Sequence, residues 1–581
     1  MTSTVSSPPT LPGMLDELFA GRLRWDLLRP FPSQDPAERA AGDAAVARLG
    51  GLLREHVDPD VVDRTGRLPD GLVAALRRDG WFSMLTEHDL GGLALSPANA
   101  LRALQAAAAL CPAVALMLGT SNGFGAGNYL PILDEGPLRD LVLRHLKAGS
   151  AHGTADTESR GAASDARDTT ATAIDGGENY LINGEKIYIG NGMIAGLLDV
   201  SATVTQDGAE QVRIFFVETD SPGVELVDLD FMGLHGAPFG VVRLTDVKVP
   251  ASQLLPSAVD LWRDDPALVR LAVVGRMLTI GPASLAIAKL CLAWSRDFVS
   301  RRAVDGRPLG EYEEIQRYLA QTAADVFTVE SVAEWVMLSA NLAGKAPEMT
   351  AAKNLLSVTC WQAMDRTLSL FAAEGYESVP SKARRGAPQV PVDRFLRDAR
   401  GLRISGGVDF LLDIWTALAS MRVIYGPDGP AASSGTPPVT DLALPPRCQD
   451  HLAHVQDQTH ALAELCRRLV TRRGLDALAE GEHDLMLAGR IATLLFGMAV
   501  VLARAAHLAE QGNTTALDLA DVSCAQARAE LAMLWAQLAA LPGESHFTGL
   551  SSRLLEGTSL DFLLADAAPG RRPGTVRPAD D

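Results

Sequence analysis

Residues 180–192 read Tyr-Leu-Ile-Asn-Gly-Glu-Lys-Ile-Tyr-Ile-Gly-Asn-Gly, and they belong to the part of the chain that decides the fold. Between about 151 and 255 apolar residues recur at every second position, and Gly-Gly, Asn-Gly and Asp-Gly pairs between these runs predict turns. On both sides, at about 45–146 and 261–423, apolar residues recur at helical spacing. The sequence therefore predicts a mainly α protein with a central antiparallel β domain.

Composition shifts divide the rest of the chain. Residues 426–446 are rich in Pro, Gly, Ser and Thr, which indicates a linker, and a second helical block follows. The tail turns Gly/Pro/Arg-rich from Pro569, which predicts disorder there. We expect an N-terminal extension with a short amphipathic piece (1–45), an N-terminal helical domain (46–150), a middle β domain (151–256), a helical bundle (257–425), a linker (426–446), an extra helical domain (447–545) and a tail (546–581).

Charge and cysteine content exclude several functions. The formal net charge of −19 argues against a nucleic-acid partner, because phosphate binding needs a basic face. The six cysteines are scattered without a CxxC pair, so neither a disulfide framework nor a metal site is predicted. The N-terminus lacks the regions of a signal peptide, and the longest apolar stretch, Ile491 to Ala503, is too short to span a bilayer. We expect a cytoplasmic protein without a transmembrane segment.

Six short motifs occur in an order that matches a known family. They are Gly80-Trp81 with His88–Leu93, Asp156-Thr157-Glu158 with Gly161 and Ser164-Asp165, Asn183–Gly192, Leu244–Pro250, Arg302–Leu309 and Arg397-Asp398. Together they resemble the acyl-CoA dehydrogenase superfamily, whose α, β, α layout agrees with the periodicity. The stretch Leu487–Leu531 is similar to the extra C-terminal domain of the very-long-chain branch, which implies a homodimer.

The resemblance implies FAD as the cofactor and assigns its contacts. Tyr188 and Gly190 stand where the family has a tryptophan and a threonine whose hydroxyl reaches the flavin N5. We expect the glycine to leave room above the flavin and to remove one hydrogen bond. Arg302 corresponds to the arginine that pairs with the pyrophosphate. The other implied contacts are Thr157, Glu158, Gly161, Ser164, Ser369 and Ala373.

The catalytic base that the resemblance implies is missing. The family glutamate, which removes the proton next to the thioester carbonyl, corresponds to Gly406, and a second family position for the base corresponds to Val274. Neither side chain can accept a proton. Asp409, three residues after Gly406, and Glu374 are candidate replacements, although each also fits a solvated surface carboxylate.

The empty base position leads to a first hypothesis for the function. A β-keto acid that loses CO₂ generates its own enolate and needs no base. We therefore predict an FAD-dependent oxidoreductase of secondary metabolism that oxidises an activated carbonyl substrate. Its specific form is the decarboxylation, dehydrogenation and monooxygenation of a β-keto acid to an epoxyketone, as in relatives of this superfamily.

Other functions stay open. The chain is alternatively an acyl-CoA or acyl-carrier-protein dehydrogenase with a relocated base, or a flavin-poor scaffold or partner subunit. The expected partners are a small-molecule acyl or keto-acid substrate, free or carrier-bound, and a second copy of the chain. A basic insertion, residues 381–390, is a candidate contact for an anionic group, and His152 and His235 are expected to be structural more often than catalytic.

Overall fold

The computed structural model describes most of the chain and divides it into two compact units, residues 1–527 and 528–581. The site described below lies wholly in the first unit. The described residues are 13–161, 167–206, 208–256, 266–338, 345–427, 429, 439–540, 544–556 and 561–564.

Helices build the N-terminal part, as the periodicity predicts. Leu72, Leu76, Leu101 and Leu104, which carry the predicted spacing, are all buried. Proline opens most of these helices, where its missing N–H costs nothing. The helices are α1 (Met14–Phe19), α2 (Pro36–His56), α3 (Pro59–Thr65), α4 (Leu72–Arg78), α5 (Pro97–Leu110), α6 (Pro112–Phe124) and α7 (Pro137–Lys147).

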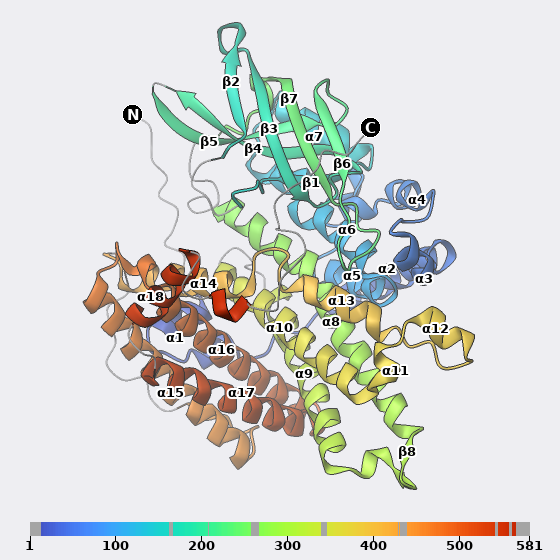
Figure 1. The fold of residues 1–581 in the computed structure, drawn as a ribbon. Coiled ribbons are helices and arrows are strands. Elements are labelled where there is room, and N and C mark those ends of the chain that lie inside the picture. Colours follow the sequence, from blue (N-terminus) through green and yellow to red (C-terminus); the bar gives the residue numbers. More distant parts are fainter. Residues whose placement is uncertain are drawn as a thin grey trace. The chain divides into compact units, whose positions relative to one another are not determined.

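A seven-stranded sheet follows and forms the upper part of Figure 1. Its strand order is β1-β4-β2-β3-β7-β6, and β5 pairs with β4. The pairs β1–β4 and β2–β4 are parallel and the other pairs are antiparallel, so the sheet is mixed where the sequence predicts an antiparallel one. Alternation predicts strands but not their direction, because side chains alternate in both kinds of sheet. The strands are β1 (Ala151–Ala155), β2 (Thr170–Ile174), β3 (Asn179–Ile189), β4 (Ala195–Gln206), β5 (Ala209–Glu218), β6 (Val224–Asp228) and β7 (Gly240–Pro250).

The Asn183-Gly184 pair is not a turn. It lies inside β3, where the pairing register with β7 shifts between Ile182 and Gly184. Gly184 has φ +152°, and a Cβ there would lie 2.5 Å from Oγ1 of Thr169. Glycine is therefore present because the backbone bulges and a neighbour approaches closely. The Gly176-Gly177 pair does connect β2 and β3, as predicted.

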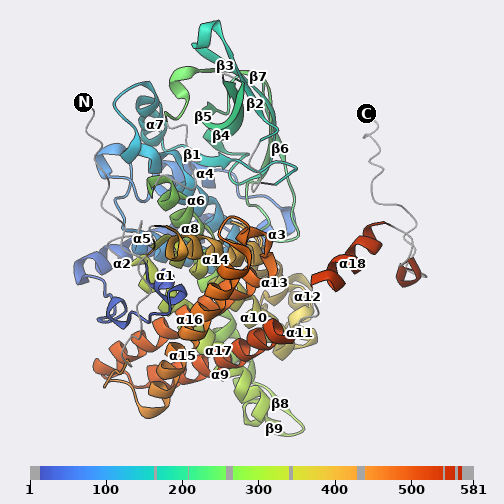
Figure 2. The ribbon, with the colours of Figure 1, turned by 90° about the vertical axis from the view of Figure 1, so that its left-hand side faces the viewer.

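A helical bundle lies below the sheet in Figures 1 and 2. Its long central helix, α8, packs against α5, α6, α9 and α10. A small hairpin of β8 (Ala303–Val304) and β9 (Arg307–Pro308) follows α8. The helices are α8 (Pro266–Ser300), α9 (Glu313–Met337), α10 (Ala346–Phe371), α11 (Ala373–Tyr376), α12 (Val379–Arg384), α13 (Val392–Leu402) and α14 (Asp409–Tyr425).

The C-terminal helices α15 (Pro446–Arg473) and α16 (Glu482–Glu510) belong to the first unit, and α16 packs against α9, α10 and α14. Helix α1, placed by the sequence in a flexible extension, is buried and packs against α10 and α14–α16. Helix α17 (Thr515–Ala540) begins in the first unit and ends in the second, which also contains α18 (Glu544–Leu555). About half of the predicted linker and the whole tail from Pro569 lie outside the described residues. The predicted domain boundaries stay predictions.

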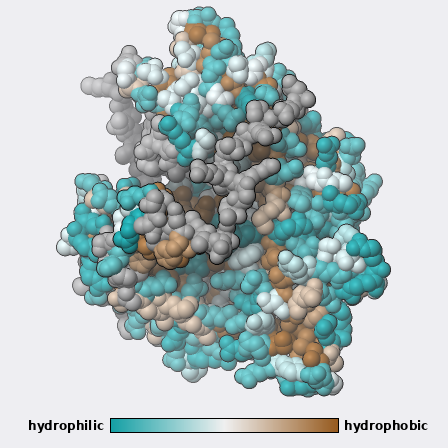
Figure 3. Space-filling model, viewed as in Figure 1, coloured by the Kyte–Doolittle hydropathy of each residue, from teal (hydrophilic) through white to brown (hydrophobic). Residues whose placement is uncertain are grey.

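Two helices are long and apolar enough to cross a membrane. They are Val274–Ser300 of α8 and α16, with mean hydropathies of 1.5 and 2.1 over their most apolar windows. In these windows 72% and 83% of the residues are buried inside the fold, which is typical of core helices in a globular protein. The face in Figure 3 is largely hydrophilic with scattered hydrophobic areas. The sequence missed the length of these apolar helices because single charged residues interrupt them.

Candidate functional site

An exposed aromatic turn ends strand β3. In this Tyr188 turn (residues 188–192), Tyr188 has φ +59° and is 56% exposed, and its ring centre lies 6.0 Å from that of Phe231. Phe231 in turn packs edge-on against Phe239 at 4.9 Å. Asn191 anchors the turn, because its side-chain amide donates to the carbonyls of Met117 on α6 and His152 on β1. The turn therefore presents an aromatic surface on a rigid base.

Gly190 lies directly beside a threonine of helix α6. A Cβ on Gly190 would lie 3.2 Å from Cγ2 and 3.3 Å from Oγ1 of Thr120. The Thr120 hydroxyl donates to the carbonyl of Leu116 at 2.8 Å. The space that we expected to be open at Gly190 is thus partly filled from another element. No sequence signal connects residue 120 with residue 190.

The Glu158 carboxylate is used inside the protein. It accepts hydrogen bonds from the amides of Asp168 and Thr169 and from Nζ of Lys186, which is fully buried. Burial alone would raise the pKa of Glu158, but these donors outweigh it and lower the pKa to about 2. The carbonyl of Thr157 accepts from the amide of Ile187 at 2.9 Å. The carboxylate therefore links three parts of the middle domain: the end of β1, the segment that precedes β2, and strand β3.

Two further predicted cofactor contacts lie near this network in the sequence. Gly161 has φ +88°, and a Cβ there would meet no heavy atom within 4 Å, so the backbone faces open space. Ser164 lies outside the described residues.

A second group of predicted cofactor contacts gathers beyond the far end of α8. Arg302, Ser369 and Ala373 are all exposed there. Glu374 lies 3.4 Å from Arg301 and 3.7 Å from Arg302, so this candidate base is an ion-pair partner of the predicted pyrophosphate arginine. At 1.5 Å per residue, the helical path from Val274 to Arg302 is roughly 40 Å long. Glu374 therefore lies with the second group, away from Val274.

Ala372 has an unusual backbone conformation in this second group. Its φ is +50° and its ψ is −133°, a region that glycine adopts freely and alanine does not. Residues 369–375 resemble an acyl-CoA dehydrogenase segment that has glycine at this position, so the sequence alone shows only that a glycine is replaced. The structure shows that its backbone conformation remained.

The turn between α13 and α14, residues 403–408 (the Gly406 turn), holds the position of the missing base. Gly406 has φ +70° and Gly407 has φ +105°. Two cations contact the turn: Nε of Arg276 donates to the carbonyl of Gly406 at 3.1 Å, and Nζ of Lys353 donates to that of Gly407 at 2.6 Å. Burial lowers the pKa of Lys353 to about 7. The sequence could not reveal this arrangement, because the two cations come from α8 and α10.

The structure also shows the surroundings of Val274, the second family position for the base, and of Asp409, a candidate replacement. Val274 is buried on α8, with 5% of its surface exposed. Asp409 begins α14 directly after the Gly406 turn, and its carboxylate accepts from Nε of Arg403 at 2.8 Å. Burial alone would raise the pKa of Asp409, but the hydrogen bond and charge of Arg403 outweigh it and lower the pKa. Asp409 is therefore near the missing base but is already paired.

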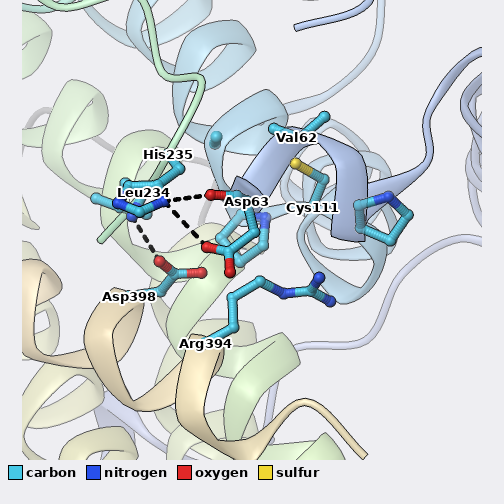
Figure 4. A pocket seen from close by; sticks show the side chains of 10 residues that line it. Val62, Asp63, Cys111, Leu234, His235, Arg394 and Asp398 are labelled. Atoms are coloured by element: carbon cyan, nitrogen blue, oxygen red, sulfur yellow. Dashed lines mark hydrogen bonds and ion pairs between the residues drawn. The ribbon is translucent and has the colours of Figure 1, made fainter. Parts of the chain in front are cut away.

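Arg397 and Asp398 of α13 join three parts of the fold, and Figure 4 shows Asp398 beside Leu234. Asp398 on α13 accepts from the amide of Leu234 at 2.5 Å, and Arg397 forms two hydrogen bonds with Asp63 of α3. Nδ1 of His235 lies 2.7 Å from the carbonyl of Asp63. A pocket lined in part by Asp63, His235 and Asp398 has space for about one water molecule. This geometry gives His235 and the Arg-Asp pair a structural role.

The other candidate histidine, His152, faces inward, whereas the basic insertion is mostly exposed and only Lys382 of its cations is buried. His152 is 1% exposed, and neither of its ring nitrogens has a hydrogen-bond partner among the described residues. Burial lowers its pKa to about 3. In the insertion, Lys382 donates to the carbonyl of Val390 and Arg385 pairs with Glu377. Most of the insertion's charge is thus used internally. The described part of the chain contains no group of three metal-ligand residues.

Comparison with known proteins shows which protein family this chain is related to. Three models match in chain order: acyl-CoA dehydrogenase N-terminal domain at 44–136, middle domain at 153–247 and C-terminal domain at 272–412. The probable acyl-CoA dehydrogenase FadE10 of Mycobacterium tuberculosis is 31% identical over 405 residues, 68% of this chain and 61% of that protein. The chain thus spans about three fifths of that relative's length.

Two further similar proteins bear on the fold and the chemistry. The 3-sulfinopropanoyl-CoA desulfinase of Advenella mimigardefordensis is 27% identical over 381 residues, 63% of this chain and 90% of that protein. The acyl-CoA dehydrogenase of Bacillus anthracis, solved in complex with FAD, has a TM-score of 0.74 at 17% identity and covers 92% of this chain and 94% of its own. Its ligand is the cofactor that the motifs predict, and its coverage includes the extra C-terminal helices. On the three matching domains in their shared order, the chain belongs to the acyl-CoA dehydrogenase family.

Proposed function

We propose that the protein is an FAD-dependent oxidoreductase that acts on acyl thioesters carried by CoA or by a carrier protein. The observation that supports this most is the Tyr188 turn, an exposed aromatic surface anchored through Asn191 to α6 and β1. An exposed aromatic surface of this kind is suited to a flat heteroaromatic ligand. FAD, when bound, supplies a hydride acceptor for the oxidation of the acyl chain.

The residues present fit FAD in two places. Tyr188 offers a ring face, while Gly161 and Gly190 have no side chain at the positions assigned to the flavin. Arg302, whose side chain is half-exposed, offers an always-charged donor fork suited to the pyrophosphate. Glu158 contributes indirectly, since its carboxylate is occupied by Lys186 and backbone amides.

The separation of the Tyr188 turn from Arg302 favours a homodimer. Tyr188 lies on the sheet, whereas Arg302 follows α8 at the opposite end from Val274. We propose that one FAD contacts the Tyr188 turn of one copy and the Arg302 group of a second copy. This arrangement would bring together contacts that a single chain separates.

A relocated base is needed if the reaction removes an α-proton. Of the two candidates, we propose Asp409, because it directly follows the Gly406 turn, whereas Glu374 pairs with Arg301 and Arg302. Its ion pair with Arg403 must loosen for the carboxylate to accept a proton. On this proposal Asp409→Asn lowers the rate of flavin reduction by roughly a hundredfold or more, the range of a lost general base. Glu374→Gln is the matched control at the other candidate.

Purified protein tests the proposed function. After reconstitution with FAD, the protein should show the absorbance of bound oxidised flavin, and acyl-CoA thioesters should bleach it without oxygen. If no flavin binds, the scaffold hypothesis replaces both enzymatic ones. If flavin binds but no thioester perturbs its spectrum, the proposed substrate class is wrong.

A decarboxylating reaction is the second candidate. It is favoured by the Gly406 turn, which has cations and no acidic side chain at the family base position. A β-keto acid would lose CO₂ and leave its electron pair on the α-carbon, so no base would be required. The relative named as a 3-sulfinopropanoyl-CoA desulfinase also removes a group by its printed name. Release of CO₂ and consumption of oxygen with a β-keto acid would support the epoxyketone reaction, and neither would occur with a simple dehydrogenase.

A further inference from the structure

The Gly406 turn is bordered by cationic side chains on the side where a side chain at 406 would extend. A Cβ on Gly406 would lie 3.5 Å from Cγ1 of Ile280, 3.6 Å from Cγ of Arg276 and 4.0 Å from Cε of Lys353. Both cations are held by main-chain carbonyls of the turn, at 3.1 Å and 2.6 Å. Carbonyl contacts orient a cation but leave its charge uncompensated. The position of the missing base therefore has a positive local charge.

Arg276 lacks a counter-ion within the described part of the chain. Only its Nε has a hydrogen-bond partner there, and no described carboxylate lies within ion-pair distance. The guanidinium is partly buried, and burial lowers its pKa to about 10. By contrast, Arg403 in the same turn pairs with Asp409. Proteins rarely bury a charge without a partner, because desolvation is costly. The two terminal nitrogens of Arg276 are thus available to a ligand.

Lys353 borders the same position of the turn as Arg276. It is fully buried on α10, and its only described hydrogen bond is to the carbonyl of Gly407. The two nearby carboxylates are engaged elsewhere: Asp409 with Arg403, and Asp413 with Asn354. Because its pKa is lowered to about 7, Lys353 is partly protonated near neutral pH, and an anion bound at Arg276 would favour its charged form.

We propose that Arg276 and Lys353 form an anion subsite for a small oxyanion group, such as a carboxylate, carried by the acyl chain of the substrate. This rests on the proposed function, because the thioester must lie beside the Gly406 turn. The family base at this position reaches the carbon next to the thioester carbonyl. The second anionic group therefore belongs on that carbon or the next one, as in malonyl and succinyl thioesters. The guanidinium fork of Arg276 binds such a group through two parallel hydrogen bonds.

The subsite gives a reason for the lost glutamate. A carboxylate at 406 would extend toward Arg276 and Lys353 and neutralise them. An acidic side chain there and an anionic acyl group would thus compete for the same cations. Gly406 keeps the subsite open, and its φ of +70° is a conformation that favours glycine.

Two CoA thioesters of similar size test the subsite. Succinyl-CoA carries a terminal carboxylate and butyryl-CoA does not, and calorimetry with the FAD-reconstituted protein gives both dissociation constants. The wild type should bind succinyl-CoA roughly tenfold to a hundredfold more tightly, the range of a charge-assisted hydrogen bond. Arg276→Gln should remove this preference and leave butyryl-CoA binding nearly unchanged. Arg276→Lys should keep part of it.

The controls separate the possible outcomes. Arg296→Gln removes an exposed arginine from the same helix and should change neither constant. Lys353→Met tests the second cation with a side chain that tolerates burial and should weaken the preference. If the wild type binds both thioesters equally, or if both variants keep the preference, the anion subsite is wrong while the proposed function stands. If neither thioester binds the wild type, the proposed function itself fails.

Discussion

At the scale of single residues, Gly190 and Ala372 show that the physical effect of a substitution depends on the surrounding structure. Gly190 stands where the family has a threonine, and Thr120 of α6 approaches the space that a side chain there would occupy. Ala372 replaced a glycine, but the backbone kept the glycine conformation. The sequence identifies both substitutions. Their physical effect depends on contacts and dihedral angles that only the folded chain defines.

A threonine at position 190 should clash with Thr120. We expect Gly190→Thr to lower the free energy of unfolding by about 1–3 kcal/mol, as overpacking in a dense interior does. In a Thr120→Ala background the same change should cost clearly less, which urea denaturation of all four proteins measures. Equal costs in both backgrounds would show that the two side chains do not compete for space.

Ala372 should be a strained residue. Because its φ is +50° and its ψ is −133°, we expect Ala372→Gly to stabilise the protein by about 1 kcal/mol. The neighbouring change Ala373→Gly lies in ordinary helical conformation and should destabilise it slightly. Thermal unfolding of the two variants gives the comparison, and a loss of stability in Ala372→Gly would contradict the strain.

At the scale of elements, the helices and strands follow the sequence more closely than their pairing does. The buried spacing of Leu72 and Leu76 predicts α4, and alternation predicts β3. The Asn183-Gly184 pair inside β3 misled the prediction, because the same dipeptide favours a turn or a bulge. The ion pair of Glu158, in the segment after β1, with Lys186 of β3 is a non-local link that no local pattern predicts.

This ion pair should make the β domain sensitive to acid. The pKa of Glu158 is lowered from 4.5 to about 2, so its stabilisation is complete above about pH 4.5 and is lost as the pH falls toward 2. Glu158→Gln should flatten the decline of the melting temperature between these values. At neutral pH it should cost about 3–5 kcal/mol, because Lys186 stays buried without its partner.

Glu185→Gln is the control for this prediction. Glu185 lies next to Lys186 on β3. Its side chain is exposed and pairs with Arg243 on the surface. Exposed pairs contribute little, so this variant should keep the wild-type pH profile. If both variants behave alike, the acid sensitivity arises elsewhere.

At the scale of the whole molecule, the separation of Tyr188 from Arg302 is the main structural argument for assembly. Each variant, Tyr188→Ala or Arg302→Gln, should retain less FAD than the wild type. Co-expression of the two variants should restore part of the binding, since a mixed dimer would contain one site with both native residues. The flavin content per chain, measured after gel filtration, gives the result. No recovery in the mixture would contradict a site shared between copies.

The sequence by itself determined the α, β, α organisation, the family motifs and the absence of an acid at Gly406 and Val274. These are local properties, since periodicity and short motifs are written in consecutive residues. Only the tertiary structure decided the parallel strand pairs, the approach of Thr120 to Gly190 and the meeting of Arg276 and Lys353 at the Gly406 turn. Residues 276, 353 and 406 come together because α8, α10 and the turn before α14 pack side by side, and no spacing along the chain encodes that contact.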